Sequence, residues 1–376
     1  MDFKNYLTDN VLKFWLDNSI DYEKGGIFTC LDREGKIYGE EKSVWFQGRA
    51  LYIFSYAYNN VEKNPEYLKA AKAIYDFLPT CTDKDDRMFF TVTRDGKEIQ
   101  KRRYYFSETF AAIGCCEYFL ATGDEEAKQK AEYYFDTAYK IYKDPSLSAP
   151  KFNPENVRLH SLSPSMIMLS TAQVLRKIDN AKYDPIAAES VNQILMHLTD
   201  KGLLENVSPE GEFVNTPTGR IVNPGHSLEA AWFLMSEGMY TGDKKLLEIG
   251  KDIIDISMKL GLRDGGILSF CDCLGFPAVA LEWDMKLWWP QCEAIIANRL
   301  CYELFGEEKY LKQYNDLLEY TDKYFADKEC GEWYGYLHYD STVANTLKGN
   351  IFKGPFHLPR MLMIVDKIEK GTYKGL

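Results

Sequence analysis

The sequence lacks any long apolar run, since no stretch approaches the roughly 20 residues that a membrane-spanning helix needs. It also lacks a basic leader with an apolar segment behind it, because it opens with the polar stretch MDFKNYLTDN. Its nine cysteines are an odd number without paired C-x-x-C spacing, which indicates reduced, buried thiols and not a disulfide framework. We therefore expect a cytoplasmic protein that does not associate with membranes.

Positive charge is also scarce. Lys and Arg total 45 against 56 Asp and Glu, so the formal net charge is −11, and the basic residues are scattered. This distribution offers no surface for phosphate backbones or anionic lipids, which argues against a nucleic-acid partner. With 45% apolar and 27% charged residues, the composition is typical of a globular chain with a large core.

Helical periodicity is the dominant pattern in the sequence. Apolar residues recur at the spacing of amphipathic or buried helices in twelve segments. The predicted helices span residues 2–17, 43–60, 65–79, 107–122, 124–142, 160–178, 183–198, 226–241, 244–261, 288–305, 308–326 and 355–369.

Short junctions join these helices in pairs. A helix-ending turn is followed at once by an acidic or Asn cap and a new helix, and so tight a turn makes the two helices antiparallel neighbours. The junctions recur about every 60 residues although the sequences between them are dissimilar, so the period is that of a structural repeat. They lie at Asn64-Pro65, Gly123-Asp124, Asp184-Pro185, Gly242-Asp243 and Gly306-Glu307.

Longer connections lead from one pair to the next. Two of them carry β-hairpin signals, 27–31 with 36–39 and 88–93 with 98–102, but no alternating βα pattern indicates a parallel sheet. Six helical hairpins can stack as an open solenoid or close into a ring. The first and last helices are unpaired and lack the polar outer face of a solenoid cap, which favours closure. We predict an all-α, single-domain (α/α)6 barrel of twelve helices over residues 1–376, with short β-hairpins in the long loops.

In such a barrel, the helix after each long connection is the inner one, and its first residues face the mouth. All six of these starts carry a polar, ionisable group. Three of the chain's five histidines, His160, His226 and His357, occupy equivalent places on separate repeats. The six starts are residues 45–49, 106–108, 160–162, 226–229, 288–293 and 356–360.

This arrangement suits the removal of a proton from carbon. Helix N-termini present positive dipole ends that stabilise a developing anion, and the same field lowers the pKa of an imidazole, keeping it neutral and able to accept a proton. Two imidazoles that face each other across a pocket could handle one carbon acid from both faces, as an epimerase requires, with Arg49 as the cation for the enediolate. His226 with Glu229 could also bind a metal, but further ligands at recognisable spacing are missing, and we predict none.

Other residues at the six starts allow more than one interpretation. Glu108 and Glu293 fit the role of cap, general acid or hydroxyl acceptor, and His160 fits a cap or packing role as well as a place in the site. Of the adjacent pair Trp288 and Trp289, at least one should line the mouth as a platform for a sugar ring, and we select Trp288. Arg360 is better explained as a solvated charge, and His197 and His338 receive no role.

At these positions the sequence resembles the N-acylglucosamine 2-epimerase family, which includes the renin-binding proteins and, more distantly, the cellobiose 2-epimerases. The resemblance extends over nearly the whole chain. Its strongest stretches are residues 25–31, 44–49, 223–234, 288–294 and 354–360, including Asn223-Pro224-Gly225-His226 and Trp288-Trp289-Pro290-Gln291-Cys292-Glu293. The family fold is also an (α/α)6 barrel.

The resemblance implies reversible epimerisation at C2 of N-acetylglucosamine and N-acetylmannosamine. It implies that His226 and His357 are the acid/base pair, that Arg49 holds the enediolate, that Glu293 is the carboxylate of the mouth, and that Glu229 binds the sugar or orients His226. It further implies that the chemistry needs no cofactor, while ATP acts as an allosteric activator, although no G-x-x-x-x-G-K-[ST] loop is present. A homodimer is left open.

Two features resemble the cellobiose epimerases instead: Gln291, and the four-residue spacing of Asn156 and His160. Mannose, glucose or cellobiose therefore stay open as substrates. Two other classes also fit the barrel. A glycoside hydrolase would use two carboxylates among Glu108, Glu229 and Glu293, and a non-catalytic binding protein would not depend on His226.

Overall fold

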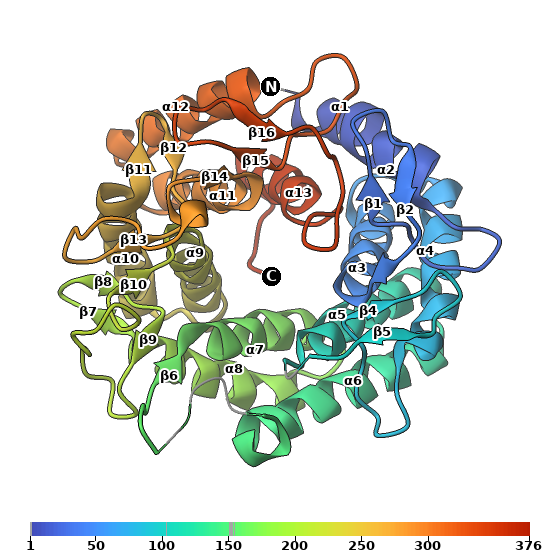
Figure 1. The fold of residues 1–376 in the computed structure, drawn as a ribbon, viewed down its shortest axis with the longest axis horizontal. Coiled ribbons are helices and arrows are strands. Elements are labelled where there is room, and N and C mark those ends of the chain that lie inside the picture. Colours follow the sequence, from blue (N-terminus) through green and yellow to red (C-terminus); the bar gives the residue numbers. More distant parts are fainter. Residues whose placement is uncertain (1, 103, 150–152, 154) are drawn as a thin grey trace.

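The computed structural model describes residues 2–102, 104–149, 153 and 155–376, and its helices form two concentric layers around a central axis (Figure 1). Twelve helical segments of the described chain pair as predicted, which confirms the (α/α)6 barrel. The inner helices are α3 (Val44–Asn60), α5 (Phe106–Thr122), α7 (Leu162–Leu175), α9 (Pro224–Thr241), α11 (Trp288–Phe305) and α13 (His357–Glu369). The outer helices are α1 (Phe3–Tyr6) continued by the π-helical η1 (Leu7–Leu12) and α2 (Lys13–Ser19), then α4 (Pro65–Phe77), α6 (Glu125–Lys143), α8 (Asn180–Leu195), α10 (Lys244–Gly261) and α12 (Glu308–Tyr324).

The predicted junctions set most of the outer-helix starts. Gly123 ends α5 in the left-handed conformation (φ 74°), and the carboxylate of the next residue, Asp124, accepts a hydrogen bond from the Glu126 N–H at 3.0 Å. The turn thereby provides a helix end and a new helix start within two residues. Asn64 and Asp243 cap the next helices in the same way, whereas α12 begins after Glu307 without a side-chain cap.

The junction predicted at Asp184-Pro185 is wrong. The helix α8 already begins at Asn180, because the carboxylate of Asp179 accepts a hydrogen bond from the Lys182 N–H at 3.1 Å, and Pro185 lies inside the helix. A proline near a helix start removes only one intrahelical hydrogen bond, which the cap at Asp179 and the buried face of α8 outweigh.

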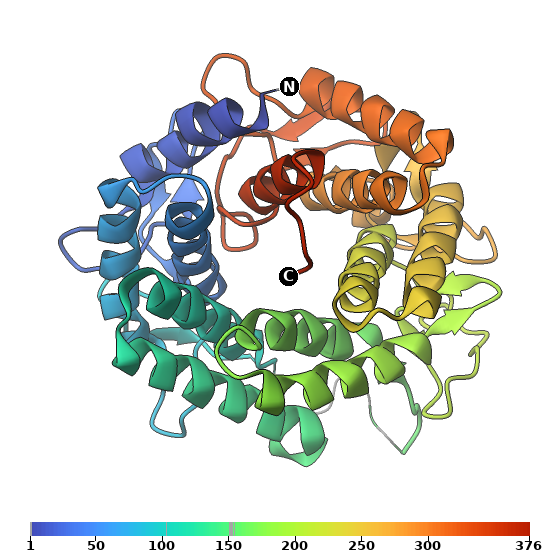
Figure 2. The ribbon, with the colours of Figure 1, turned by 180° about the vertical axis from the view of Figure 1, so that it is seen from behind.

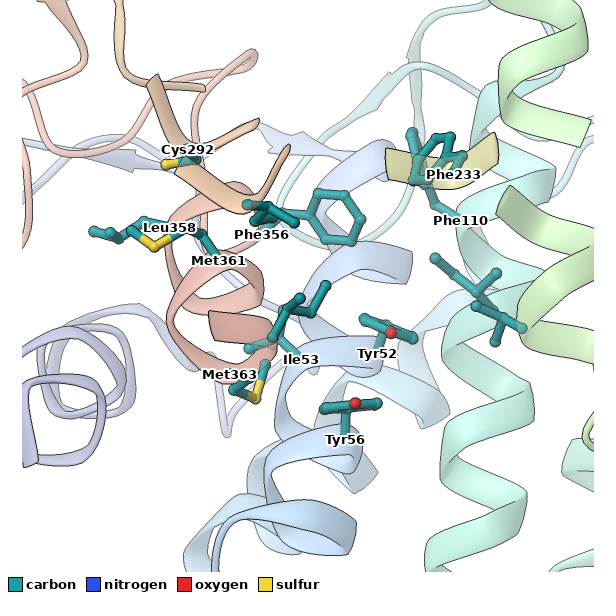
Figure 3. Packing of buried hydrophobic residues seen from close by; sticks show 14 of the residues in the cluster. Tyr52, Ile53, Tyr56, Phe110, Phe233, Cys292, Phe356, Leu358, Met361 and Met363 are labelled. Carbon is teal, nitrogen blue, oxygen red and sulfur yellow. The ribbon is translucent and has the colours of Figure 1, made fainter. Parts of the chain in front are cut away.

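The inner helices are apolar on nearly every side because they contact both the outer layer and their inner neighbours. Helices α3 and α5 come so close that a Cβ atom on Gly48 would lie 2.4 Å from the carbonyl carbon of Phe110. Toward the barrel axis, aromatic and Met side chains from different helices pack together, among them Tyr52, Phe356 and Met363 (Figure 3). None of the described helices is both long enough and apolar enough to cross a membrane.

Short antiparallel strands connect neighbouring loops at the mouth of the barrel. A strand just before one inner helix pairs with the connection before the next, so the starts of the inner helices are held relative to one another. Both predicted hairpins are present, with shorter strands: β1 (Cys30–Leu31) with β2 (Ile37–Gly39), and β4 (Thr91–Val92) with β5 (Glu98–Gln100). The other strands are β3 (Lys42–Ser43), paired with β4; β6 (His160–Ser161) with β9 (Asn206–Val207); β7 (Leu198–Thr199) with β8 (Gly202–Leu203); β10 (Ile221–Val222) with β13 (Cys271–Asp272); β11 (Leu262–Arg263) with β12 (Gly266–Ile267); and β14 (Lys286–Leu287) with β15 (Tyr336–Leu337) and β16 (Val343–Asn345).

Two glutamines fasten inner helices to these loops in the same way. The Gln47 side chain accepts from the Ile27 N–H at 2.8 Å and donates to the Ile27 carbonyl at 3.0 Å. Gln291 repeats both bonds with Ile267, each at 2.8 Å. Each amide satisfies a buried backbone donor and a buried acceptor that have no ladder partner.

The ring closes where its two ends meet. Helix α13 packs against α1 and η1, and Arg33 forms an ion pair with Asp327 at 2.8 Å that joins the first and last repeats. Behind α13, residues 372–376 turn inward and run toward the centre of the ring, as the views from both sides show (Figures 1 and 2). The Tyr373 hydroxyl bonds Ser236 of α9 at 2.6 Å and fixes this segment.

Candidate active site

A cavity of about 580 Å³ opens inside the ring at the end where the inner helices begin. Its wall is mostly apolar and carries a small group of charged side chains. Such a cavity, apolar with a few convergent polar groups, is the usual form of a small-molecule site. The ionisable side chains of the wall that bear on the chemistry are Arg49, Glu205, His226, Glu229 and Arg360.

His226 reaches the cavity from the first turn of α9. Asn223 caps this helix by accepting a hydrogen bond from the His226 N–H at 3.1 Å, which fixes the backbone from which the imidazole projects. The ring Nδ1 lies 2.8 Å from the Glu205 carboxylate. Because a carboxylate only accepts, Nδ1 carries a proton, and Nε2 is the nitrogen left for a substrate.

His357 opens α13 and has a matching carboxylate. Its Nδ1 lies 2.7 Å from Oε1 of Glu293, while Oε2 of Glu293 accepts from the Trp232 indole at 2.8 Å. Glu293 is fully buried, and His357 is 7% exposed. Both histidines are therefore oriented through Nδ1 by a glutamate, with Nε2 free for chemistry.

Trp289 is a neighbour of both histidines. The centroid of its ring system is 5.2 Å from the His226 ring and 5.6 Å from the His357 ring. Gly225 makes room for it, because a Cβ atom there would lie 2.5 Å from the indole. Residues 131 positions apart in the chain thus share one aromatic neighbour. His226 lines the cavity, whereas His357 and Trp289 lie behind its lining residues.

Arg360 ties the carboxylates of the site together. Its Nη2 contacts Glu229 and lies 2.8 Å from Oε1 of Glu293, the same oxygen that His357 bonds. Our interpretation of Arg360 as a solvated charge is wrong, since the residue is 5% exposed. The carboxylates of Glu229 and Glu293 and the His357 nitrogen also approach within 4.8 Å of one another, a spacing that a metal could use. The guanidinium of Arg360 already supplies positive charge to both carboxylates there.

Arg49 has a different environment. Its guanidinium carbon lies 4.0 Å from the centroid of the Phe110 ring and 4.6 Å from that of Phe356, and its Nε has no partner among the described residues. Burial lowers its pKa to about 9, and the charge of Arg360 contributes to the shift. Arg49 still carries its charge at neutral pH, so the cavity contains a cation without a paired carboxylate.

The pKa values of the two imidazoles are shifted in opposite directions. Burial alone would lower the pKa of His226, but the Glu205 carboxylate outweighs it, so the pKa of His226 is raised. Burial and the charges of Arg360 and Arg49 hold the pKa of His357 well below its usual value. Our expectation that helix N-termini lower the pKa of both imidazoles is therefore wrong for His226. Opposite pKa shifts in two neighbouring groups distinguish an acid from a base.

Three residues predicted for the site lie elsewhere. Glu108 points away from the cavity and holds Arg87 at 2.6 Å and the Met88 N–H at 3.0 Å. His160 lies beside His197, with ring centroids 5.2 Å apart. Trp288 is buried edge-on against Tyr336 and His357 (centroids 5.6 and 6.3 Å apart), so its neighbour Trp289, which touches both histidines, is the better platform.

Solved structures place this ring in a known class of proteins. It superimposes on cellobiose 2-epimerase from Bacillus thermoamylovorans B4167 with a TM-score of 0.83, at 22% identity and 98% coverage of both chains. A D-mannose isomerase gives a TM-score of 0.85 at 18% identity, with 97% of both chains covered. The architecture is thus the (α/α)6 barrel of sugar epimerases and isomerases.

Sequence similarity identifies the family. A profile of the N-acylglucosamine 2-epimerase (GlcNAc 2-epimerase) family matches residues 26–353. The N-acylglucosamine 2-epimerase of Bos taurus is 38% identical over an alignment of 387 residues that covers 98% of this chain and 90% of the bovine one. The chain therefore belongs to the N-acylglucosamine 2-epimerase family, as the resemblance of its motifs predicted.

Proposed function

We propose that this protein is an isomerase that interconverts N-acetylglucosamine and N-acetylmannosamine. The observation that carries the proposal is that His226 and His357 both lie against Trp289, each with its Nδ1 held by its own glutamate. The identity with the bovine enzyme supports this sugar pair. A cytoplasmic location belongs to the proposal as well, supported by nine unpaired cysteines.

The reaction begins with the open-chain aldehyde form of the sugar. One imidazole takes the proton from C2, the C–H electron pair forms a C1–C2 double bond, and the carbonyl electrons move to O1. Arg49 is placed to stabilise this enolate oxygen, because it is a cavity cation that no carboxylate pairs with among the described residues. The second imidazole returns a proton to the opposite face of C2, which inverts the centre, and exchange with solvent restores both imidazoles.

The pKa shifts indicate which histidine starts in which form. The lowered pKa of His357 favours the neutral form that removes a proton, and the raised pKa of His226 favours the cationic form that supplies one. A state with both forms serves the epimer whose C2–H faces His357. The reverse reaction starts from the opposite protonation state. Hydrogen–deuterium exchange at C2 in variants that lack one histidine assigns each epimer to the histidine that removes its proton.

A glycoside hydrolase on the same barrel is less well supported. Glu229 and Glu293 bind the same Arg360 guanidinium, and Glu108 holds a loop away from the cavity. None of these pairs gives the two carboxylates separated by a glycosidic bond that hydrolysis requires. The amide of Gln291, a feature of the cellobiose-type interpretation, is engaged by the backbone of Ile267.

Solvent isotope incorporation tests the proposal. Incubation with N-acetylmannosamine in D2O should place deuterium at C2 of both epimers without releasing a shorter sugar. His357→Asn should abolish epimerisation, whereas His338→Asn, at an exposed histidine outside the site, should not. Cleavage without exchange at C2 would favour a hydrolase, and binding without any turnover would favour a binding protein.

A panel of free sugars tests the choice of substrate and the predicted activation. N-acetylglucosamine, N-acetylmannosamine, glucose, mannose and cellobiose would be compared with and without ATP. We expect exchange at C2 to be fastest with the two N-acetyl sugars and ATP to raise their rate. A preference for mannose, glucose or cellobiose would assign the chain to one of the alternative epimerases.

A further inference from the structure

A second cavity, of about 590 Å³, lies at the opposite end of the barrel from the histidines. The ends of α3, α5 and α13 and the inward-turning residues 372–376 form its wall. Leu376 borders both this cavity and the one that holds His226, so this segment separates the two. The role of the second cavity is therefore separate from that of the proposed epimerase site.

Its charge is opposite to that of the whole protein. Four lysines line it, Lys63, Lys177, Lys367 and Lys374, and among the described residues of its wall only Glu117 has a carboxylate side chain. The chain as a whole has a net charge of −11, so a cavity with an excess of positive charge is a local exception. Like charges gathered in a concave, partly desolvated space repel one another and attract an anion.

The hydrogen bonds of the cavity leave this charge largely unbalanced. Glu117 forms an ion pair with Lys177 at 2.7 Å. Lys367 bonds only neutral acceptors, the Tyr56 hydroxyl and the Asn60 side-chain oxygen, each at 2.7 Å, and no carboxylate pairs with it among the described residues. Two bonds leave the third ammonium proton of Lys367 available to a ligand.

The two best-placed ammonium groups converge on one ring. Lys367 Nζ lies 4.7 Å and Lys177 Nζ 5.4 Å from the centroid of Tyr56. Burial, with the charge of Lys177 next, lowers the pKa of Lys367 to about 8. A pKa shift in this direction agrees with an ammonium group, that of Lys367, which lies near a second cation and has no carboxylate partner among the described residues.

Helix ends offer a simpler explanation that the contacts do not support. Lysines near helix C-termini are favoured because they neutralise the exposed carbonyl groups. The hydrogen bonds of Lys177 and Lys367, however, go to side chains of α3 and α5. Their ammonium groups are directed across the cavity, to where a ligand would sit.

We propose that this basic cavity is a binding site for a phosphate group, free or as the monoester of a small molecule, held by Lys367, Lys177 and the Tyr56 hydroxyl. Phosphate is the oxyanion whose charge and several acceptor oxygens match two converging ammonium groups and a hydroxyl donor. The exposed side chains of Lys63 and Lys374 add to the attraction at the rim.

Calorimetric titration of the whole protein at pH 7 tests the site directly. Inorganic phosphate and glycerol 3-phosphate serve as probes for the free and esterified forms, and sodium chloride of equal ionic strength is the reference. We expect saturable binding of at least one phosphate probe. Lys367→Met should weaken it at least tenfold, whereas Lys370→Met, which removes an exposed lysine paired with Asp366 on the same segment, should not.

Thermal unfolding separates site binding from general salt effects. Phosphate stabilises many proteins by exclusion from their surfaces, but that effect is equal in both lysine variants, whereas a bound ligand raises the melting temperature only where its site is intact. Equal shifts in both variants, or absence of saturable heat with either probe, would overturn the proposal. Because neither measurement uses sugar turnover, the result is independent of the epimerase proposal.

Discussion

Glu205 holds His226 through a 2.8 Å contact from its carboxylate to Nδ1, and this contact favours the charged form of the imidazole. The pKa of His226 is raised because the attraction of Glu205 outweighs the effect of burial. The pKa of His357 is shifted the opposite way, well below its usual value, which favours its neutral form.

Glu205→Gln should lower the pKa of His226 and shift the pH profile. A cationic acid loses its proton as the pH rises through its pKa, so the alkaline limb of the rate profile should move to lower pH. The rate at neutral pH should fall about 100-fold or more, the contribution typical of general acid–base catalysis. Glu210→Gln, at an exposed position nearby, is the control. An unchanged profile would remove Glu205 from the mechanism.

Replacing one histidine at a time should separate proton exchange from epimerisation. In His226→Asn, His357 can still remove a proton from its own side of C2 and return it there. In His357→Asn, His226 can do the same on the other side. Each variant should lose epimerisation by about 100-fold or more, yet keep exchange of the C2 hydrogen with D2O for one epimer only, measured by NMR. Exchange of the same epimer in both variants would contradict the two-sided arrangement.

Arg49 and Arg360 should respond oppositely to replacement by Met. Arg49 has no carboxylate partner, so Arg49→Met should abolish turnover while the protein melts at a temperature no lower than before. Arg360→Met leaves the carboxylates of Glu229 and Glu293 without a cation, and should lower the free energy of unfolding by about 3–5 kcal/mol. Calorimetric melting compares the two, and a large destabilisation by Arg49→Met would assign that residue a structural role.

Gly225→Ala should damage the site through Trp289. The added methyl group would lie 2.5 Å from the indole, which must then move away from both histidines. We expect a loss of stability of about 1–3 kcal/mol, as for overpacking elsewhere, together with a fall in kcat. Combining the change with Trp289→Phe, whose ring is smaller, should recover the stability. A fully active Gly225→Ala enzyme would show that the position of Trp289 is unimportant.

The paired glutamine clamps should contribute equally to stability. Gln47→Leu and Gln291→Leu each leave a buried N–H and carbonyl without partners, and each should cost about 1–3 kcal/mol in urea unfolding. Gln129→Leu, at an exposed position on α6, is the control. If Gln291→Leu lowered kcat/KM while the free energy of unfolding stayed the same, the amide would belong to the substrate site.

The barrel was predictable because helix periodicity and capping turns are local signals. At Gly123-Asp124, two adjacent residues indicate both the end of one helix and the start of the next. The prediction at Asp184-Pro185 failed because Asp179 and Asp184 are both acidic residues that could cap the helix. Only the packing of the outer helix selects Asp179. Local chemistry could not resolve that choice.

The site was predictable where a side chain sits on an inner-helix start, as for His226 and His357. Glu205 lies in a loop between two short strands, where no motif marks it, and its importance depends on a contact across 21 positions. Trp289 and Trp288 are adjacent, so helix rotation alone separates their roles. Arg360 forms ion pairs with Glu229 and Glu293, which lie on two other helices. The spacing of these residues in the sequence does not indicate that they are in contact.

Closure of the ring by α13 also bears on how the protein is made. His357 and Arg360 lie on α13, which is synthesised after the other helices of the ring, so a nascent chain that still lacks it has neither the base nor the bridging guanidinium. Until then, the apolar sides of α3 and α11 that α13 covers face water, which is the kind of surface that draws chaperones or aggregates. We therefore expect that truncating the chain within α13 makes the protein insoluble, and that this effect appears before any loss of turnover can be measured.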